Sequence, residues 1–142
     1  PTEKAPLKDI RISYTEKWQQ THWRAIESAY NNSPFFEYYK EDYESFFTRK
    51  TEFLIDLNQG LLEKTLELIR MNKKISLSEV YKRKDELGDT DDKRRCFHPK
   101  QTTPYQGKPY YQVFDQKFGF QPNLSIIDML FNLGPESILY LK

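Results

Sequence analysis

The chain has 142 residues and a formal net charge of +1, because 22 basic residues nearly balance 21 acidic ones. This balance gives no electrostatic reason to expect a nucleic acid or an anionic membrane surface as a partner. The one cysteine, Cys96, excludes an intramolecular disulfide framework and a thiolate zinc cluster, which fits a reducing compartment. No apolar run has the length of a membrane span or a signal peptide. We therefore expect a cytoplasmic protein, without membrane insertion, that forms a single domain over residues 1–142.

The first half of the chain predicts a short strand followed by helices. Residues 8–13 alternate between polar and apolar, which is typical of a half-buried strand. Ser13 and Glu16 have the spacing of a capping box, which predicts a helix that ends at Asn31-Asn32. The aromatic residues of segment 35–47 follow no single period, so we interpret this segment as two short helical turns broken near residues 40–42.

The second half predicts a long helix, an exposed loop and a last helix. Leucines at three- and four-residue spacing predict a helix over about residues 49–71, in which Gly60 indicates a kink or a close approach. Residues 75–78 alternate and are a second candidate strand, whereas segment 82–95 has the charged composition of an exposed, disordered loop. Ser125 and Gly134-Pro135 bound the last helix. The predicted fold is therefore helix-dominated α+β, with three substantial helices, a few short strands and a long polar loop.

No short motif identifies a reaction or a cofactor. The chain lacks a phosphate-binding glycine loop, a dinucleotide fingerprint, a His-Glu-x-x-His pair and paired cysteines. With only two histidines, a metal site would consist mainly of carboxylates, and we expect none. The candidates for chemistry are therefore single residues.

The two histidines are the candidate general bases. His22 lies on an aromatic helix face, where a hydrogen-bonded residue at the edge of the core is the favoured explanation over catalysis. Glu27 is the nearest glutamate after it, at an awkward spacing for a helix pair. His98 precedes Pro99 in an irregular stretch, where functional residues are common, and it has no evident packing role.

Polar residues around the last helix are the candidate substrate contacts. Asp128 favours the start of this helix electrostatically, which is a sufficient structural explanation, but it can also orient a histidine. Asn132 lies in an apolar run and needs a partner. We expect segment 109–112 to pack beside helix 123–132, because about ten residues and the reversing Gly119 separate them. The candidate substrate-binding residues are Tyr111, Gln112, Asn123 and Asn132.

Several blocks of the sequence resemble the WbqC-like protein family. They are Lys8-Asp9-Ile10-Arg11-Ile12, the segment from Trp18 to Tyr39, Phe97-His98-Pro99-Lys100, the segment from Pro109 to Phe114, and the segment from Phe120 to Asn132. The resemblance covers nearly the whole chain in the correct order, and the charged segment 82–95 shows no shared pattern. Family members begin with a strand, a turn and a hairpin that end just before Pro1. The resemblance thus implies that the chain is the C-terminal part of a longer domain. A strand edge left open near Ile10–Ile12 would then favour a homodimer.

The resemblance also implies a role in the synthesis of bacterial surface polysaccharide such as O-antigen, because family members occur in such gene clusters. Glycine transfer has been proposed for one member. The leading expectation is a transferase that acts on a sugar or sugar nucleotide. In it, His98 or His22 is the general base, Asp128 or Glu27 orients the base, and Tyr111, Gln112 and Asn132 bind the substrate. The alternative is a non-catalytic binding or assembly module of the same pathway, in which no histidine meets a carboxylate in a cleft.

Overall fold

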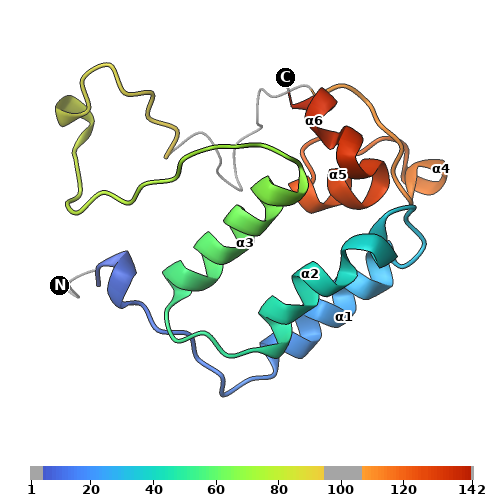
Figure 1. Cartoon of the computed structure of the whole chain (residues 1–142), viewed down its shortest axis with the longest axis horizontal. Helices are drawn as coiled ribbons and strands as arrows, with labels where there is room; N and C mark the ends of the chain where they lie inside the picture. Colours follow the sequence, from blue (N-terminus) through green and yellow to red (C-terminus); the bar gives the residue numbers. More distant parts are fainter. Residues whose placement is uncertain (1–4, 95–106, 142) are drawn as a thin grey trace.

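The computed structural model describes residues 5–94 and 107–141. Its longer helices are α1 (Trp18–Tyr30), α2 (Phe36–Thr48) and α3 (Leu54–Leu68), and its shorter ones are α4 (Asp115–Phe118), α5 (Ile126–Leu133) and α6 (Ser137–Tyr140). Short 3-10 helices are η1 (Leu7–Asp9), η2 (Lys84–Glu86) and η3 (Gly134–Glu136). Helices α1 and α2 lie side by side, α3 contacts α2, and α5 packs with α6 near the C-terminal end of α3 (Figure 1).

The expected α+β class is wrong, because the described stretches contain helices and no β-strand. Where the sequence predicts a strand at residues 8–13, the structure has η1 and an isolated antiparallel bridge between Arg11 and Phe53. The N–H of Ile12 donates to the Glu52 carbonyl and the N–H of Leu54 to the Ile10 carbonyl, both at 2.9 Å. The bridge cannot lengthen because Leu54 already begins α3. The strand edge expected near Ile10–Ile12 is replaced by this bridge, and residues 75–78 also form no strand.

Helix α2 is continuous, so the break predicted near residues 40–42 is wrong. Its buried residues Phe36, Tyr39 and Tyr43 follow the three- and four-residue spacing of one helix face. Tyr38 obscures this period in the sequence, because it is an aromatic residue whose surface is 78% exposed. The aromatic segment therefore builds a full helix that covers the core.

Helices α1 and α3 both begin later than the sequence predicts, at Trp18 and at Leu54 rather than near residue 49. The capping box expected at Ser13 does not form, since α1 begins at Trp18 without a side-chain cap. Instead, the Trp18 indole N–H donates to the Ser13 carbonyl at 3.0 Å. The close approach expected at Gly60 is confirmed: a Cβ atom there would lie 2.9 Å from the Phe46 ring. The missing side chain thus lets α2 and α3 come together.

The core is built around Phe131 of α5. Its ring meets the rings of Tyr30, Phe36 and Tyr43 edge-on, with centroids 5.2 to 5.5 Å apart. Such aromatic pairs stabilise beyond the area that they bury. Gly134 ends α5 with a φ of +58°, and Phe35 packs so closely there that a Cβ atom would lie 2.6 Å from its ring. Phe131 therefore links α5 to both α1 and α2.

Beyond α3 the chain leaves the helical body and returns to it as the C-terminal helices (Figure 1). Over residues 82–94 the side chains are exposed, apart from half-buried Leu87 and Asp92. Among the described residues, no helix combines the length and the apolar character that crossing a membrane requires.

Candidate functional site

The carboxyl group of Asp128 is the centre of a buried polar cluster. Asp128 lies in the first turn of α5 and is 4% exposed. Its Oδ2 accepts a hydrogen bond from the Tyr110 hydroxyl at 2.7 Å and from Nε2 of Gln112 at 3.1 Å. These bonds confirm that segment 109–112 packs beside this helix, as the sequence predicts. Ser125 occupies the N-cap position, but its side chain makes no cap bond; the N–H of Asp128 donates to the Ser125 carbonyl instead.

Gln112 fastens the turn that precedes α5. Its side chain is buried, and Nε2 also donates to the Gln121 carbonyl at 2.9 Å. Its Oε1 accepts from the N–H of Gln121 at 2.8 Å. One side chain thereby closes the loop that contains α4 and Gly119, and it ties this loop to Asp128. Each polar atom of the Gln112 amide is satisfied, as burial requires.

Asn132 lies one helical turn after Asp128 on the same face. Its Nδ2 donates to the backbone carbonyl of Asp128 at 2.7 Å and lies 3.4 Å from Oδ1 of the same residue. Within the described part of the chain, the buried Oδ1 of Asn132 has no hydrogen-bond partner. A buried amide oxygen without a donor is uncommon and destabilising.

Two tyrosine hydroxyls from distant segments converge on Asp128. Burial raises the pKa of Tyr30 in α1, and the charge of Asp128 and a hydrogen bond to it raise it further. Burial is also the largest cause of the raised pKa of Tyr110, followed by the hydrogen bond to Asp128. Both hydroxyls therefore remain protonated at neutral pH, and the Tyr110 hydroxyl orients the carboxyl group through its hydrogen bond to Oδ2.

This arrangement fits positioning better than proton transfer. Oδ2 of Asp128 already accepts two hydrogen bonds, Oδ1 lies 3.4 Å from Nδ2 of Asn132, and the residue is 4% exposed. A general base must reach the proton that it abstracts. Asp128 thus has a positioning role. It fixes Tyr110 and Gln112, and these two residues in turn position Tyr111 and the loop before α5.

An open hollow of about 560 Å³ adjoins the cluster. Tyr110 and Tyr111 line this hollow, and Asp115 and Gln116 of α4 contribute polar groups. Tyr111 is 49% exposed, so part of its surface is free to contact a ligand. The remaining lining residues are Pro109, Phe120 and Tyr140. Pockets for small molecules commonly combine aromatic walls with a few polar groups in this way.

Of the other predicted catalytic residues, the two that the structure describes, His22 and Glu27, are not brought to this cluster. His22 is exposed on α1, where its ring contacts the Trp18 ring edge-on at 5.5 Å. Glu27 pairs with Lys40 of α2 at 3.3 Å rather than with a histidine. His98 lies outside the described residues. Among those that are described, no group of three or more His, Cys, Asp or Glu side chains is arranged to hold a metal ion.

The backbone conformation at Asn123 explains why asparagine occupies this position, without a contact to a substrate. It is exposed and has a φ of +62°, a left-handed conformation that asparagine tolerates better than most residues. Sequence reasoning did not single out Tyr30, the Tyr110 hydroxyl, the backbone of Gln121, or Asp115 and Gln116 of the hollow. No sequence signal identifies Tyr30, because its ring fits the apolar stripe of α1 and its hydroxyl adds nothing to that pattern.

A family model described as the WbqC-like protein family matches residues 1–103 and 93–140 of the chain. The two matched segments together span nearly the whole sequence, including the cluster around Asp128. No curated protein and no solved structure was found to match the chain.

Proposed function

The chain belongs to the WbqC-like protein family, and from this premise we propose that it is the substrate-binding part of a cytoplasmic transferase. The enzyme would act on a sugar or sugar nucleotide in bacterial surface-polysaccharide synthesis, with glycine as the candidate group transferred. The pathway is what the family resemblance implies. The observation that carries the site is the hollow beside Tyr111, which the buried hydrogen bonds of Asp128 hold in shape.

The hollow offers both kinds of contact that a sugar needs. A sugar ring has C–H faces that pack on aromatic rings and hydroxyls that require hydrogen-bond partners. Tyr111 offers a half-exposed ring, and Asp115 and Gln116 offer a carboxyl and an amide group in the same hollow. A hollow that is already held in shape favours binding, because fewer side chains lose conformational freedom when the ligand binds.

In this proposal Asp128 and Gln112 are positioning residues, and His98 is the general base. Asp128 does not itself touch the substrate, since its side chain is buried behind Tyr110. His22 and Glu27 have no role in the reaction, because each contacts a different partner away from the hollow.

A non-catalytic binding module of the same pathway is the second candidate. It is favoured by the hydrogen bonds that already engage Asp128 and by the separation of His22 from the cluster. Both candidates predict that the hollow binds a sugar, and they differ in whether a covalent product forms.

Calorimetric titration with methyl glycosides of hexoses and N-acetylhexosamines tests the binding. We expect Tyr111→Ala to weaken binding at least tenfold and Tyr81→Ala to leave it unchanged, because Tyr81 is an exposed tyrosine on a different surface. Equal affinity of the two variants would contradict the assignment of the hollow.

A second assay separates the two candidates. The protein is incubated with activated glycine and sugar nucleotides, and the products are analysed by mass spectrometry. A product heavier by one glycyl group supports the transferase and should disappear in His98→Ala. Sugar binding without any mass change supports the binding module.

A further inference from the structure

Arg70 follows the last turn of α3 in a backbone conformation that favours glycine. Its φ is +57°. The N–H of Arg70 donates to the Glu67 carbonyl at 2.9 Å, and the N–H of Met71 donates to the Leu66 carbonyl at 2.8 Å. This is the Schellman arrangement that closes a helix, and its left-handed position is usually glycine. A non-glycine residue there is strained, and strained residues cluster at ligand sites.

The side chain of Arg70 borders an aromatic cavity of about 260 Å³ between α2, α3 and η3. The apolar lining residues are Phe35, Tyr38, Tyr39, Leu68 and Pro135. Tyr38 packs edge-on against Tyr39, with centroids 5.0 Å apart and ring planes at 82°. Since Tyr38 is 78% exposed, this packing leaves one face of its ring free. The cavity therefore presents flat apolar surface next to a guanidinium group.

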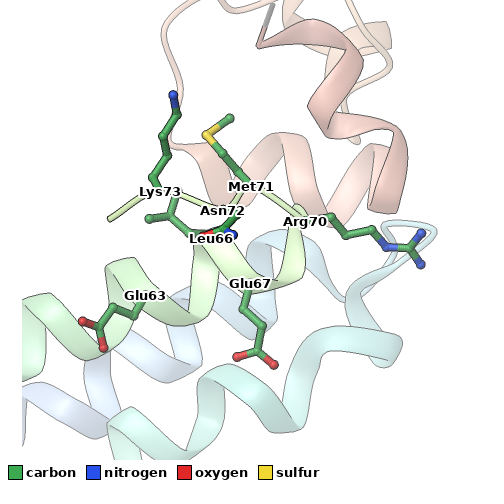
Figure 2. A pocket seen from close by; sticks show the side chains of 7 residues that line it. All are labelled: Glu63, Leu66, Glu67, Arg70, Met71, Asn72 and Lys73. Atoms are coloured by element: carbon green, nitrogen blue, oxygen red, sulfur yellow. The ribbon is translucent and has the colours of Figure 1, made fainter. Parts of the chain in front are cut away.

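The positive charge of Arg70 is directed away from neighbouring acidic groups. Figure 2 shows its side chain leaving the end of α3 in a different direction from Lys73 and away from the carboxylates of Glu63 and Glu67. In the part of the chain that the structure describes, Arg70 makes no ion pair. Burial raises the pKa of Tyr39 while the charge of Arg70 acts against this rise, so the guanidinium lies within electrostatic range of the cavity wall.

Among the described residues, the nearby carboxylates of Glu67 and Asp42 form their ion pairs with Lys64 and not with Arg70. Glu67 also lines the cavity, but its carboxylate is paired with Lys64 at 2.8 Å. The acidic residues Glu37, Glu41 and Asp42 of α2 line an adjoining hollow, which shares Tyr38 with the cavity and also includes Lys64. Arg70 is thus the positively charged lining residue of this cavity, and within the described part of the chain its guanidinium has no ion-pair partner.

We propose that this cavity binds a nucleotide, with the base on the aromatic rings and the phosphate on the Arg70 guanidinium. Bases stack on aromatic side chains with little regard to sequence, because every base has a π-face. Arginine matches phosphate with two parallel N–H donors. The site goes beyond the sugar hollow proposed above, and it shares no lining residue with that hollow.

Calorimetric titration of Arg70→Gly with uridine and adenosine monophosphates tests the proposal. Glycine suits a φ of +57° better than arginine, so this variant should have a thermal midpoint equal to or above that of the natural protein. We expect the better of the two nucleotides to bind the natural protein and to bind Arg70→Gly at least tenfold more weakly, because a charged hydrogen bond is lost. Uridine, adenosine and inorganic phosphate should each bind the natural protein at least tenfold more weakly than that nucleotide. Tyr38→Ala should weaken nucleotide binding about fivefold or more.

Tyr111→Ala is the matched control, and it should leave nucleotide affinity unchanged. Equal nucleotide affinity of the natural protein and Arg70→Gly would overturn the proposal. A nucleoside that binds as tightly as its monophosphate, or the absence of nucleotide binding to the natural protein, would do the same. Loss of nucleotide binding in Tyr111→Ala but not in Arg70→Gly would place the nucleotide at the sugar hollow instead, and loss of sugar binding alone would leave the nucleotide site standing.

Discussion

Replacing Tyr110 by phenylalanine removes one hydroxyl from the buried cluster and leaves the ring in place. The ring keeps its edge-on contacts with Phe120 and Tyr140, at 5.4 and 6.0 Å between centroids. The hydroxyl donates to Asp128 at 2.7 Å, and a hydrogen bond to a carboxylate contributes about 1.5–3 kcal/mol. Because Gln112 still donates to the same oxygen, we expect a loss of about 2 kcal/mol in the free energy of unfolding.

The neighbouring tyrosine provides the control. Tyr111 is half exposed, so Tyr111→Phe should change stability by less than about 0.5 kcal/mol. Urea denaturation followed by circular dichroism gives both free energies by linear extrapolation. For a domain of this size, the difference corresponds to a fall in Tm of roughly 6 °C for Tyr110→Phe. If the two variants lose the same small amount, the Tyr110 hydroxyl does not support the cluster and this reasoning is refuted.

Three further predictions concern other parts of the molecule. The pKa values of Tyr30 and Tyr110 are raised above their ordinary value near 10, so the stability that these tyrosines contribute is complete below that pH and is lost as the pH rises further. The urea midpoint should therefore fall between pH 8 and 11, and it should fall less steeply in Tyr110→Phe. Gly134→Ala should lower the stability by roughly 2 kcal/mol more than Gly119→Ala, since both positions have positive φ but only the first places a Cβ against the Phe35 ring. Equal losses of stability in thermal melts would show that the Phe35 ring moves aside at little cost. Asn132→Ala should cost only about 1 kcal/mol, because removing its unpartnered Oδ1 offsets part of the lost bond to the Asp128 carbonyl; a loss above about 3 kcal/mol in urea titrations would mean that the amide oxygen is bonded in solution.

The sequence predicts those parts of the fold that depend on local pattern. Helix α1 and helix α5 are bounded by residues that the sequence singles out, Asn31 and Gly134, because a helix end has local chemistry. The strand predicted at residues 8–13 does not form, because an alternating pattern describes only one of the two segments that must pair. A strand also needs a partner of sufficient length, and the partner here turns into α3 at Leu54.

The site is predictable only where chain proximity restricts the geometry. Gln112 and Asp128 are close in sequence, and a reversal at Gly119, with φ of +66°, brings them together. Tyr30 joins the same carboxyl group from α1, and that contact depends on how α1 packs against α5. The sequence offers Glu27 as a carboxylate for His22 only at an awkward spacing. Residues five apart on a helix point to different sides, and Lys40 of α2 takes the glutamate.

The proposed site is tested most directly by a map of where a sugar binds. Titration of the ¹⁵N-labelled protein with the best-binding methyl glycoside, followed by amide chemical shifts, reports on every ordered backbone N–H. We expect the largest shifts on segment 110–116 and on Phe120 and Tyr140, which include the lining of the hollow beside Asp128, and we expect these shifts to vanish in Tyr111→Ala. Shifts concentrated on α1 around His22, or shifts that persist unchanged in Tyr111→Ala, would contradict it.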